Sequence, residues 1–384
     1  MPMKPARERL PRVTDVEFPA GRRVVAISDI HGNLPFLKGL LEKIAFSTDD
    51  ILVLVGDLIE KGNYNLETLH FIMDLCRTHT VYPVAGNCDD LVPEFVLGDG
   101  GGDRTFYRHY FTVWPNSCLR QMGALAGVER VETPEDMEKL RRALRERFLP
   151  ELEFLRDLPT VLRTPELLFV HGGVSDEDHP ETISAWKCMK NDEFRSQNVH
   201  FRRWCVVGHW PVTLYDPYIP NAAPIIDREQ RLISIDGGCV LKLDGQLNAL
   251  ILPDARSEDF SCVSYDGRPV AVALADQAPS ARSRNIRWSE HEVEVLERGE
   301  EFSRCRHVRT GYEMDILTRY LYHPDQRFTP CEDATDYELP VTAGDRLSVV
   351  TETSRGALCK KHGVTGWYRG GLKWPEQNGK DLLK

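Results

Sequence analysis

Five short motifs of acidic, imidazole and amide side chains occur along this chain of 384 residues. Carboxylate oxygens and imidazole nitrogens together suit manganese, iron or zinc. Two such ions can activate a water molecule and neutralise the oxygens of a phosphoryl group. The motifs therefore predict a two-metal site for the hydrolysis of a phosphate ester. In chain order they are Asp29-Ile30-His31-Gly32, Gly56-Asp57 through Gly62, Gly86-Asn87-Cys88-Asp89, His171-Gly172-Gly173 and Gly208-His209.

Each motif directly follows a short apolar run, as expected of residues at the carboxyl end of a buried strand. The first two runs are 23–28 and 51–55, and leucines at helical spacing fill the segment 34–44 between them. A second amphipathic segment, 64–79, leads to the run 81–85, which completes a β-α-β-α-β pattern. Loops at this end of parallel strands converge on one crevice, so we expect the motifs to meet there.

The sheet pattern resumes with two runs, 167–170 and 205–207, which end in His171 and His209. We expect an insertion between the two parts of this pattern, at about 91–160, with a glycine loop at Gly98 to Gly102 and a charged helical run at 135–156. This insertion should cover the rim of the site. Closing strands of a second sheet are predicted at 233–239, 240–243 and 247–252.

The chain is longer than the roughly 100 to 200 residues of one domain, so we expect a catalytic domain and a smaller module. In the last hundred residues we expect helices at 290–301 and 314–322, followed by short β-prone runs that suit a small barrel. The predicted divisions are an amino-terminal extension at 1–20, the catalytic domain at 21–253, a linker at 254–284 and a carboxy-terminal domain at 285–384.

The composition narrows the choice of partners. The net charge of -11 argues against nucleic acid, whose binding depends on clustered Lys and Arg. No apolar stretch approaches the roughly 18 residues of a membrane span, and the first twenty residues lack the apolar core of a secretory signal. The ten cysteines are scattered, which indicates reduced thiols rather than a disulfide framework. We therefore expect a cytoplasmic protein with no membrane partner.

Residues 23 to about 250 resemble the calcineurin-like metallophosphoesterases, and most closely their phosphoprotein phosphatase branch, which includes bacterial diadenosine tetraphosphatases. The resemblance implies an α/β fold, a four-layer β-sandwich flanked by helices, to which the chain adds a small mostly-β carboxy-terminal domain. It also implies two divalent ions as cofactors, with manganese as the first choice and iron or zinc as alternatives. The first ion would be bound by Asp29, His31 and Asp57, and the second by Asp57, Asn87, His171 and His209, with Asp57 as the bridge.

Three positions depart from the phosphatase pattern. Many protein phosphatases have Asp-Arg where this chain has Glu60-Lys61, and lysine lacks the planar fork of arginine. Cys88 stands where the branch has a histidine that acts as the leaving-group acid. Pro211 stands where related phosphodiesterases, which share the Gly-Asn-Cys-Asp form, have a second histidine. We assign phosphate binding to Lys61 and Asn87, and the remaining catalytic roles to Cys88, Asp89 and Glu60. For Cys88 the alternative is a small apolar residue that packs beside the site.

Three functions remain open. The first is hydrolysis of phosphomonoesters, with phosphoserine or phosphothreonine in proteins as the expected substrate class. The second is hydrolysis of nucleotide or cyclic phosphodiesters, which Cys88 and the missing arginine favour, because a diester depends less on an arginine clamp. The third is a weakly active regulatory protein that binds metal. The carboxy-terminal module, from about 340, resembles bacterial SH3-like modules through Gly366-Trp367-Tyr368. We expect the carboxy-terminal domain to bind a peptide partner or to dock on the catalytic face.

Overall fold

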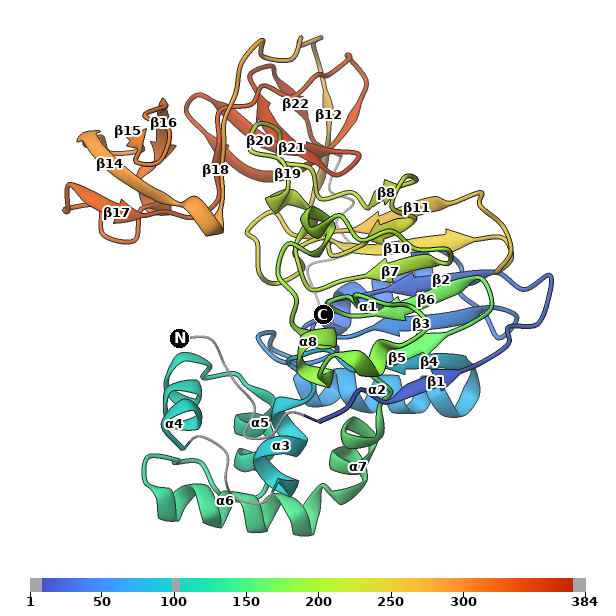
Figure 1. Cartoon of the computed structure of the whole chain (residues 1–384). Helices are drawn as coiled ribbons and strands as arrows, with labels where there is room; N and C mark the ends of the chain where they lie inside the picture. The colour runs from blue at the N-terminus through green and yellow to red at the C-terminus, as the bar shows by residue number, and fades with distance from the viewer. Residues whose placement is uncertain (1–8, 99–103, 376–384) are drawn as a thin grey trace. The chain divides into compact units, whose positions relative to one another are not determined.

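A computed structural model of the chain describes residues 9–98 and 104–375 (Figure 1). These residues divide into two compact units. The predicted glycine loop lies largely at 99–103, outside the described residues. No described helix is long and apolar enough to cross a membrane. The described part of unit 1 is 9–98, 104–211, 224–241 and 246–265, and that of unit 2 is 212–223, 242–245 and 266–375.

The first sheet of unit 1 has five strands in the order β11-β10-β2-β3-β4 (Figure 1). The three strands β2, β3 and β4 are parallel, and β10 and β11 add to them in antiparallel fashion. The strands are β2 Val24–Ile27, β3 Ile51–Val55, β4 Thr80–Val84, β10 Leu247–Leu252 and β11 Ser261–Tyr265.

The second sheet of unit 1 has six strands in the order β1-β5-β6-β7-β9-β8. Its central strands β6, β7 and β9 are parallel to one another, so their carboxyl ends share one edge. The strands are β1 Val13–Asp15, β5 Val161–Arg163, β6 Leu167–Val170, β7 Trp204–Val207, β8 Ile225–Asp227 and β9 Leu232–Ser234.

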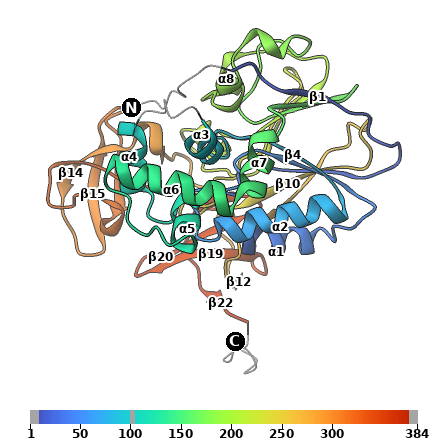
Figure 2. The same cartoon turned by 90° about the horizontal axis from the view of Figure 1, so that it is seen from below.

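The two sheets pack face to face, and helices cover their outer faces. In β3, Ile51, Val53 and Val55 face the second sheet, while Leu52 and Leu54 contact the helical layer. Both faces of this strand are buried, which explains its unbroken apolar sequence. Helices α1 Leu34–Lys43 and α2 Asn65–Thr78 lie side by side on the first sheet (Figure 2), and α8 Ala185–Met189 packs on the second. The result is the predicted four-layer β-sandwich.

The segment between β4 and β5 is helical. The prediction of a charged helical run at 135–156 is confirmed by α6 and α7. Thr133 begins α6 with a capping box, in which its hydroxyl accepts the Asp136 N–H and the Asp136 carboxylate accepts the Thr133 N–H. The helices are α3 Leu91–Leu97, α4 Arg104–Val113, α5 Cys118–Leu125, α6 Pro134–Arg147 and α7 Leu149–Asp157.

Unit 2 is built from antiparallel strands. One sheet has the order β21-β20-β19-β12-β22, another has the order β16-β15-β14-β17, and β13 pairs with β18. The strands are β12 Val270–Ala273, β13 Asn285–Ile286, β14 Glu292–Glu297, β15 Phe302–His307, β16 Glu313–Leu317, β17 Phe328–Pro330, β18 Ala334–Thr335, β19 Arg346–Thr353, β20 Gly356–Lys361, β21 Val364–Tyr368 and β22 Leu372–Lys373. Short 3-10 helices occur in both units at Pro180–Thr182, Phe194–Gln197, Val212–Leu214, Trp288–Glu290 and Thr318–Tyr320.

Three predicted elements are wrong. The segment 290–301 forms β14 rather than a helix, because cross-strand ion pairs neutralise the charge that suggested a helix: Glu294 pairs with Arg306 at 2.9 Å. The segment 314–322 contains β16 and a 3-10 turn, since its alternating buried residues fit the neighbouring strand. The predicted strand at 240–243 is a turn. The range expected to be a linker, 254–284, contains β11 and β12, which belong to different units.

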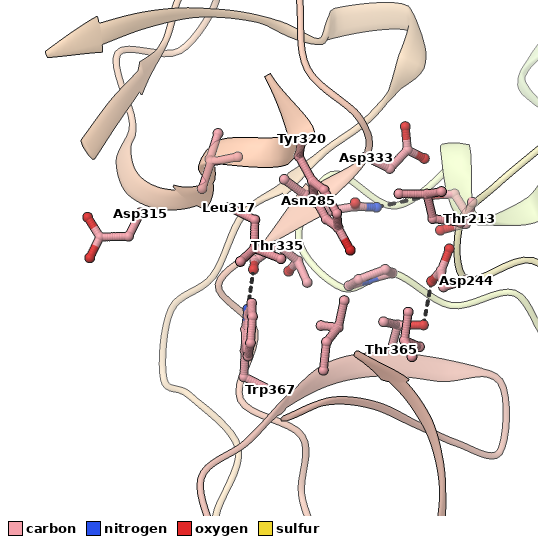
Figure 3. Close-up of a pocket in the computed structure, with 16 residues that line it drawn as sticks. Thr213, Asp244, Asn285, Asp315, Leu317, Tyr320, Asp333, Thr335, Thr365 and Trp367 are labelled. Carbon is pink, nitrogen blue, oxygen red and sulfur yellow. Dashed lines mark hydrogen bonds between the residues drawn. The ribbon is translucent and has the colours of Figure 1, made fainter. Parts of the chain in front are cut away.

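A pocket lies within unit 2 (Figure 3). Three carboxylates line it, those of Asp244, Asp315 and Asp333. Each already has a partner in unit 2: the Thr365 hydroxyl donates to Asp244, Arg355 pairs with Asp315 at 2.7 Å, and Lys242 pairs with Asp333 at 2.8 Å. Its aromatic lining comes from Tyr320 and Trp367, whose indole N–H donates to the Thr335 carbonyl at 2.7 Å.

Candidate active site

The loops after five strands bring together all six predicted metal ligands. The loop after β2 carries Asp29 and His31, and those after β3 and β4 carry Asp57 and Asn87. The loops after β6 and β7 carry His171 and His209 from the second sheet. Backbone hydrogen bonds tie these loops together: the Asp29 N–H donates to the Gly56 carbonyl at 3.0 Å, and the His31 N–H donates to the Asp57 carbonyl at 2.9 Å. The site is therefore built where the two sheets present their carboxyl edges.

Four of these ligands have a left-handed backbone, with φ of 55° at Asp29, 50° at His31, 50° at Asp57 and 67° at His209. Non-glycine residues rarely adopt this conformation, and it persists only where the surroundings hold it. Here it lies in the loops that directly follow β2, β3 and β7. Such clustering of unfavourable backbone is typical of functional sites.

Two glycines make room for these side chains. A Cβ on Gly86 would lie 2.1 Å from the Asp57 nitrogen and 2.3 Å from its Oδ1. A Cβ on Gly56, whose φ is +77°, would lie 2.6 Å from the His171 ring. Both positions therefore require glycine to keep the ligands in place.

The donor atoms lie at distances suited to divalent ions. His31 Nε2 is 3.7 Å from Asp57 Oδ2 and 3.8 Å from Asp29 Oδ1, and His171 Nε2 is 3.4 Å from Asp57 Oδ1. Ligands about 2.1 Å from one ion are roughly 3 to 3.5 Å apart, so small adjustments would close the shells. Donor atoms within 4.8 Å of one another form two groups, His31 with Asp57 and Cys88, and Asp57 with His171 and His209. Asp57 belongs to both groups.

Several buried donor atoms in this space have no hydrogen-bond partner among the described residues. They are Asp29 Oδ1, both ring nitrogens of His31, Asn87 Oδ1 and His171 Nε2. More than nine in ten buried polar groups in proteins are satisfied, so such a concentration is unusual. Cations bound between these atoms would satisfy them, and the carboxylate, imidazole and amide donors fit manganese, iron or zinc.

Burial and neighbouring charge set the protonation of these groups. Burial lowers the pKa of His31 to about 3, and the positive charge of Lys61 acts in the same direction. Burial lowers the pKa of His209 to about 4. Both imidazoles are therefore neutral near pH 7, as metal binding requires. At the coupled pair of Asp57 and His171, burial is outweighed by mutual attraction, which lowers the pKa of Asp57 and raises that of His171.

Hydrogen bonds restrict the orientation of three of the predicted ligands, His171, His209 and Asp29. His171 Nδ1 lies 2.8 Å from the Val55 carbonyl, which leaves Nε2 for the site. His209 Nε2 lies 2.8 Å from Asp192 Oδ1, which leaves Nδ1 for the site. The His209 N–H also donates to Asp29 Oδ2 at 3.0 Å, so Asp29 keeps only Oδ1 for a cation. Partners of this kind tune the affinity of metal sites.

We expect Asp192→Ala to weaken metal binding by about tenfold, because the His209 ring then loses the acceptor that orients it. The measurement is a competition titration of Mn²⁺ against a chelating dye. Asp49→Ala, at an exposed aspartate outside the site, is the control and should bind Mn²⁺ like the unaltered protein. Equal affinity for all three proteins would show that Asp192 does not support the ligand.

The residues predicted for catalysis lie beside the donor atoms in different environments. The Cys88 N–H donates to Asp57 Oδ1 at 2.8 Å, and its thiol accepts from the Asn87 amide at 3.4 Å. Burial and the Asp57 charge raise the pKa of the Cys88 thiol well above its usual value, so it stays protonated at neutral pH. Asp89 accepts the Leu58 N–H at 2.8 Å through Oδ1 and the Gly86 N–H at 2.8 Å through Oδ2. It thereby ties together the loops after β3 and β4.

Glu60 and Lys61 follow Asp57 in the same loop. The Glu60 side chain is buried, and its carboxylate accepts the Cys118 N–H at 3.2 Å. Burial raises the pKa of Glu60 to about 7, against the opposing effect of Tyr110. Lys61 is partly exposed, and its charge acts on Asp57 as well as His31. The loop thus brings the positive charge of Lys61 close to the candidate metal-donor atoms.

Asp236 is a residue of this region that the sequence analysis missed. It is fully buried, and its Oδ1 accepts the Gly238 N–H at 2.8 Å while its Oδ2 has no hydrogen-bond partner among the described residues. Burial and the charge of Asp29 raise its pKa well above the usual value. The signal was present, because Asp236 follows the apolar run of β9 as the other motifs follow theirs.

Parts of this chain are similar to known proteins. Residues 22–222 match the family model described as calcineurin-like phosphoesterase. A bis(5'-nucleosyl)-tetraphosphatase PrpE [asymmetrical] of Halalkalibacterium halodurans is 24% identical over 249 residues, which cover 59% of this chain and 89% of that protein. A symmetrical bis(5'-nucleosyl)-tetraphosphatase of Ectopseudomonas mendocina is 45% identical over 67 residues, or 17% of this chain and 24% of that protein.

Among solved structures, a serine/threonine phosphatase from Saccharomyces cerevisiae aligns with a TM-score of 0.41 at 11% identity. The alignment covers 67% of this chain and 84% of that chain.

Proposed function

Because this chain belongs to the calcineurin-like phosphoesterase family, we propose that it hydrolyses phosphomonoesters with the help of two divalent metal ions. As a member of that family it is a phosphoric ester hydrolase, and the proposal concerns its substrate and its site. The observation that carries the proposal is the sharing of Asp57 between two groups of donor atoms. A shared carboxylate can hold two cations close together, which is the arrangement used by two-metal phosphatases.

We assign the first ion to Asp29, His31 and Asp57, and the second to Asp57, Asn87, His171 and His209. Manganese is the proposed ion, with iron and zinc as alternatives, because both donor sets combine carboxylate or amide oxygens with imidazole nitrogens. When bound, the two ions would lower the pKa of water toward neutrality and so supply the hydroxide that attacks phosphorus.

The residues around the proposed ions would bind the phosphoryl group and protonate the leaving group. Lys61 brings positive charge and, with the Asn87 amide, would hold the oxygens of the phosphoryl group. The protonated thiol of Cys88 would give its proton to the leaving-group oxygen. Asp89 would act through the backbone that it holds, and Glu60 through the loop that carries Lys61.

Two observations favour a second candidate, the hydrolysis of nucleotide phosphodiesters or dinucleoside polyphosphates. Lys61 is a point charge rather than an arginine fork, and a substrate with fewer charges on phosphorus needs less clamping. The relatives described above are named as bis(5'-nucleosyl)-tetraphosphatases. In a dinucleoside polyphosphate the leaving group is itself a phosphate. Such a group departs readily and depends less on a strong acid than an alcohol does.

The decisive measurement is the ratio of kcat/KM for a nitrophenyl phosphomonoester to that for the matching phosphodiester, with diadenosine tetraphosphate as a third substrate. Metal-stripped protein reloaded with Mn²⁺ is used throughout. A monoester preference is expected and would justify a screen of phosphopeptides. Preference for the diester or for the dinucleotide would replace the phosphomonoesterase proposal by the nucleotide one. If none of the three substrates is hydrolysed, the favoured function becomes that of a metal-binding regulatory protein.

The role of Cys88 gives a separate prediction. We expect Cys88→Ser to lower kcat/KM for alkyl phosphates by about 10²-fold, because they need a proton on the departing oxygen. Nitrophenyl phosphate, with its good leaving group, should lose far less. Cys76→Ser, at a half-buried thiol of α2, serves as the control. Equal losses for both substrates in Cys88→Ser would assign this residue to packing alone.

The proposal also covers the role of unit 2. Unit 2 is proposed to bind a peptide, which its exposed Trp288, Tyr322 and Phe328 support, since aromatic side chains are common at recognition surfaces. The likeness of its last strands to an SH3-like module stays a prediction, as does the cytoplasmic location.

A further inference from the structure

The loop that carries Lys61 has an unfavourable backbone. Glu60 and Lys61 both have positive φ, 77° and 69°, although neither is glycine. Two left-handed side-chain-bearing residues in succession are rare, and the surroundings must hold them. The lysine stem is flexible, so the side chain does not fix its own direction. The backbone conformation of the loop therefore matters, because it sets the direction in which the Lys61 side chain leaves the chain.

Hydrogen bonds from Asn65 hold the inner side of this loop. Its Oδ1 accepts the Glu60 N–H at 2.7 Å, and its Nδ2 donates to the Gly62 carbonyl at 2.9 Å. The same Nδ2 donates at 2.7 Å to the carbonyl of Asn116, which precedes α5 in the helical insertion. Asn65 is fully buried, so its bonds to Glu60 and Gly62 are shielded from water.

The insertion holds the outer side of the loop. The Glu60 carboxylate accepts the N–H of Cys118, the first residue of α5, at 3.2 Å. Gln121, one turn further along α5, donates from Nε2 to the Asn63 carbonyl at 3.1 Å and accepts the Leu66 N–H at 3.1 Å through Oε1. Residues more than fifty positions away in the chain thus satisfy the polar groups on both sides of Lys61.

We propose that the helical insertion positions Lys61 for phosphate binding, with Glu60, Asn65 and Gln121 as positioning residues. The inference rests on the proposed function, in which Lys61 holds the phosphoryl group. It gives the insertion a part in the binding of every phosphate substrate, in addition to any contact with the rest of the substrate. A lysine needs this support more than an arginine does, because a single ammonium cannot fix its own orientation on phosphate.

The test is the affinity of the full chain, loaded with Mn²⁺, for inorganic phosphate by titration calorimetry. Lys61→Met should weaken it by about tenfold or more, since a charge-assisted contact is lost. Gln121→Leu and Glu60→Leu should weaken it by about threefold to tenfold. Glu60→Gln keeps an acceptor for the Cys118 N–H and should lose less than Glu60→Leu. Metal content should be the same in all variants.

A double-mutant cycle distinguishes positioning of Lys61 from non-specific destabilisation of the helical insertion. In the Lys61→Met background, Gln121→Leu should have almost no further effect, because it acts through the missing lysine. Arg120→Leu is the matched control: Arg120 is also on α5 and donates to the Phe111 and Glu129 carbonyls at 2.8 and 3.1 Å, contacts that lie inside the insertion. It should leave phosphate affinity unchanged.

Additive losses in the cycle, or an equal loss in Arg120→Leu, would overturn the positioning role. Unchanged phosphate affinity in Lys61→Met would overturn it as well. Failure of the proposed function has a different signature, which is full turnover by Asp57→Asn whatever the Glu60 and Gln121 variants do.

Discussion

Asp57→Asn is expected to abolish turnover of nitrophenyl phosphate, with a loss of at least about 10³-fold in kcat. Asp57 is the residue common to both groups of donor atoms, and its carboxylate carries the charge that would hold two cations together. An asparagine keeps the shape and an acceptor for the Cys88 N–H, which lies 2.8 Å from Asp57 Oδ1. The variant should therefore fold normally while losing metal.

The measurement pairs steady-state kinetics with metal analysis and thermal unfolding. Fewer bound ions per chain and an intact unfolding transition are expected beside the loss of turnover. The Asp49→Ala protein described above is a suitable control for an aspartate outside the site. Turnover like that of the unaltered protein in Asp57→Asn would refute the two-metal assignment.

Removal of the metal ions should lower kcat about as much as Asp57→Asn does. Dialysis against a chelator is expected to lower kcat by at least about 10³-fold, because free water near neutral pH supplies little hydroxide. Addition of Mn²⁺ should restore turnover, and Zn²⁺ or Fe²⁺ should restore it to different extents. Mg²⁺ should restore less, since imidazole donors suit it poorly.

The chelated protein itself provides a structural readout. Its buried donors, among them Asp29 Oδ1 and His171 Nε2, lose the cations proposed to satisfy them. Rebinding of Mn²⁺ should therefore raise the unfolding temperature, because a ligand that binds the native state stabilises it. Asp57→Asn should show little of this rise. Full turnover by protein shown to be free of metal would rule out a metal-assisted reaction.

The positions of the metal-ligand candidates were predictable from the chain because the signal is local. Each apolar run of three to six residues ends in a polar motif, and parallel strands place their ends at one edge of their sheet. The loops after β2, β3, β4, β6 and β7 accordingly bring those residues together. The strands within 290–301 and 314–322 were wrongly predicted as helices, since local charge and spacing favour helix, whereas pairing with neighbouring strands imposes β-structure.

The sequence by itself predicted the candidate ligands, their order and their place at the carboxyl ends of strands, because strand and turn patterns are short-range. Only the tertiary structure decided which partners orient them. Asp192 supports His209, Asp236 lies buried near Asp29, and Gln121 reaches the loop of Lys61 across more than fifty residues. Contacts of this kind depend on how distant segments pack, and no local pattern of residues specifies that packing.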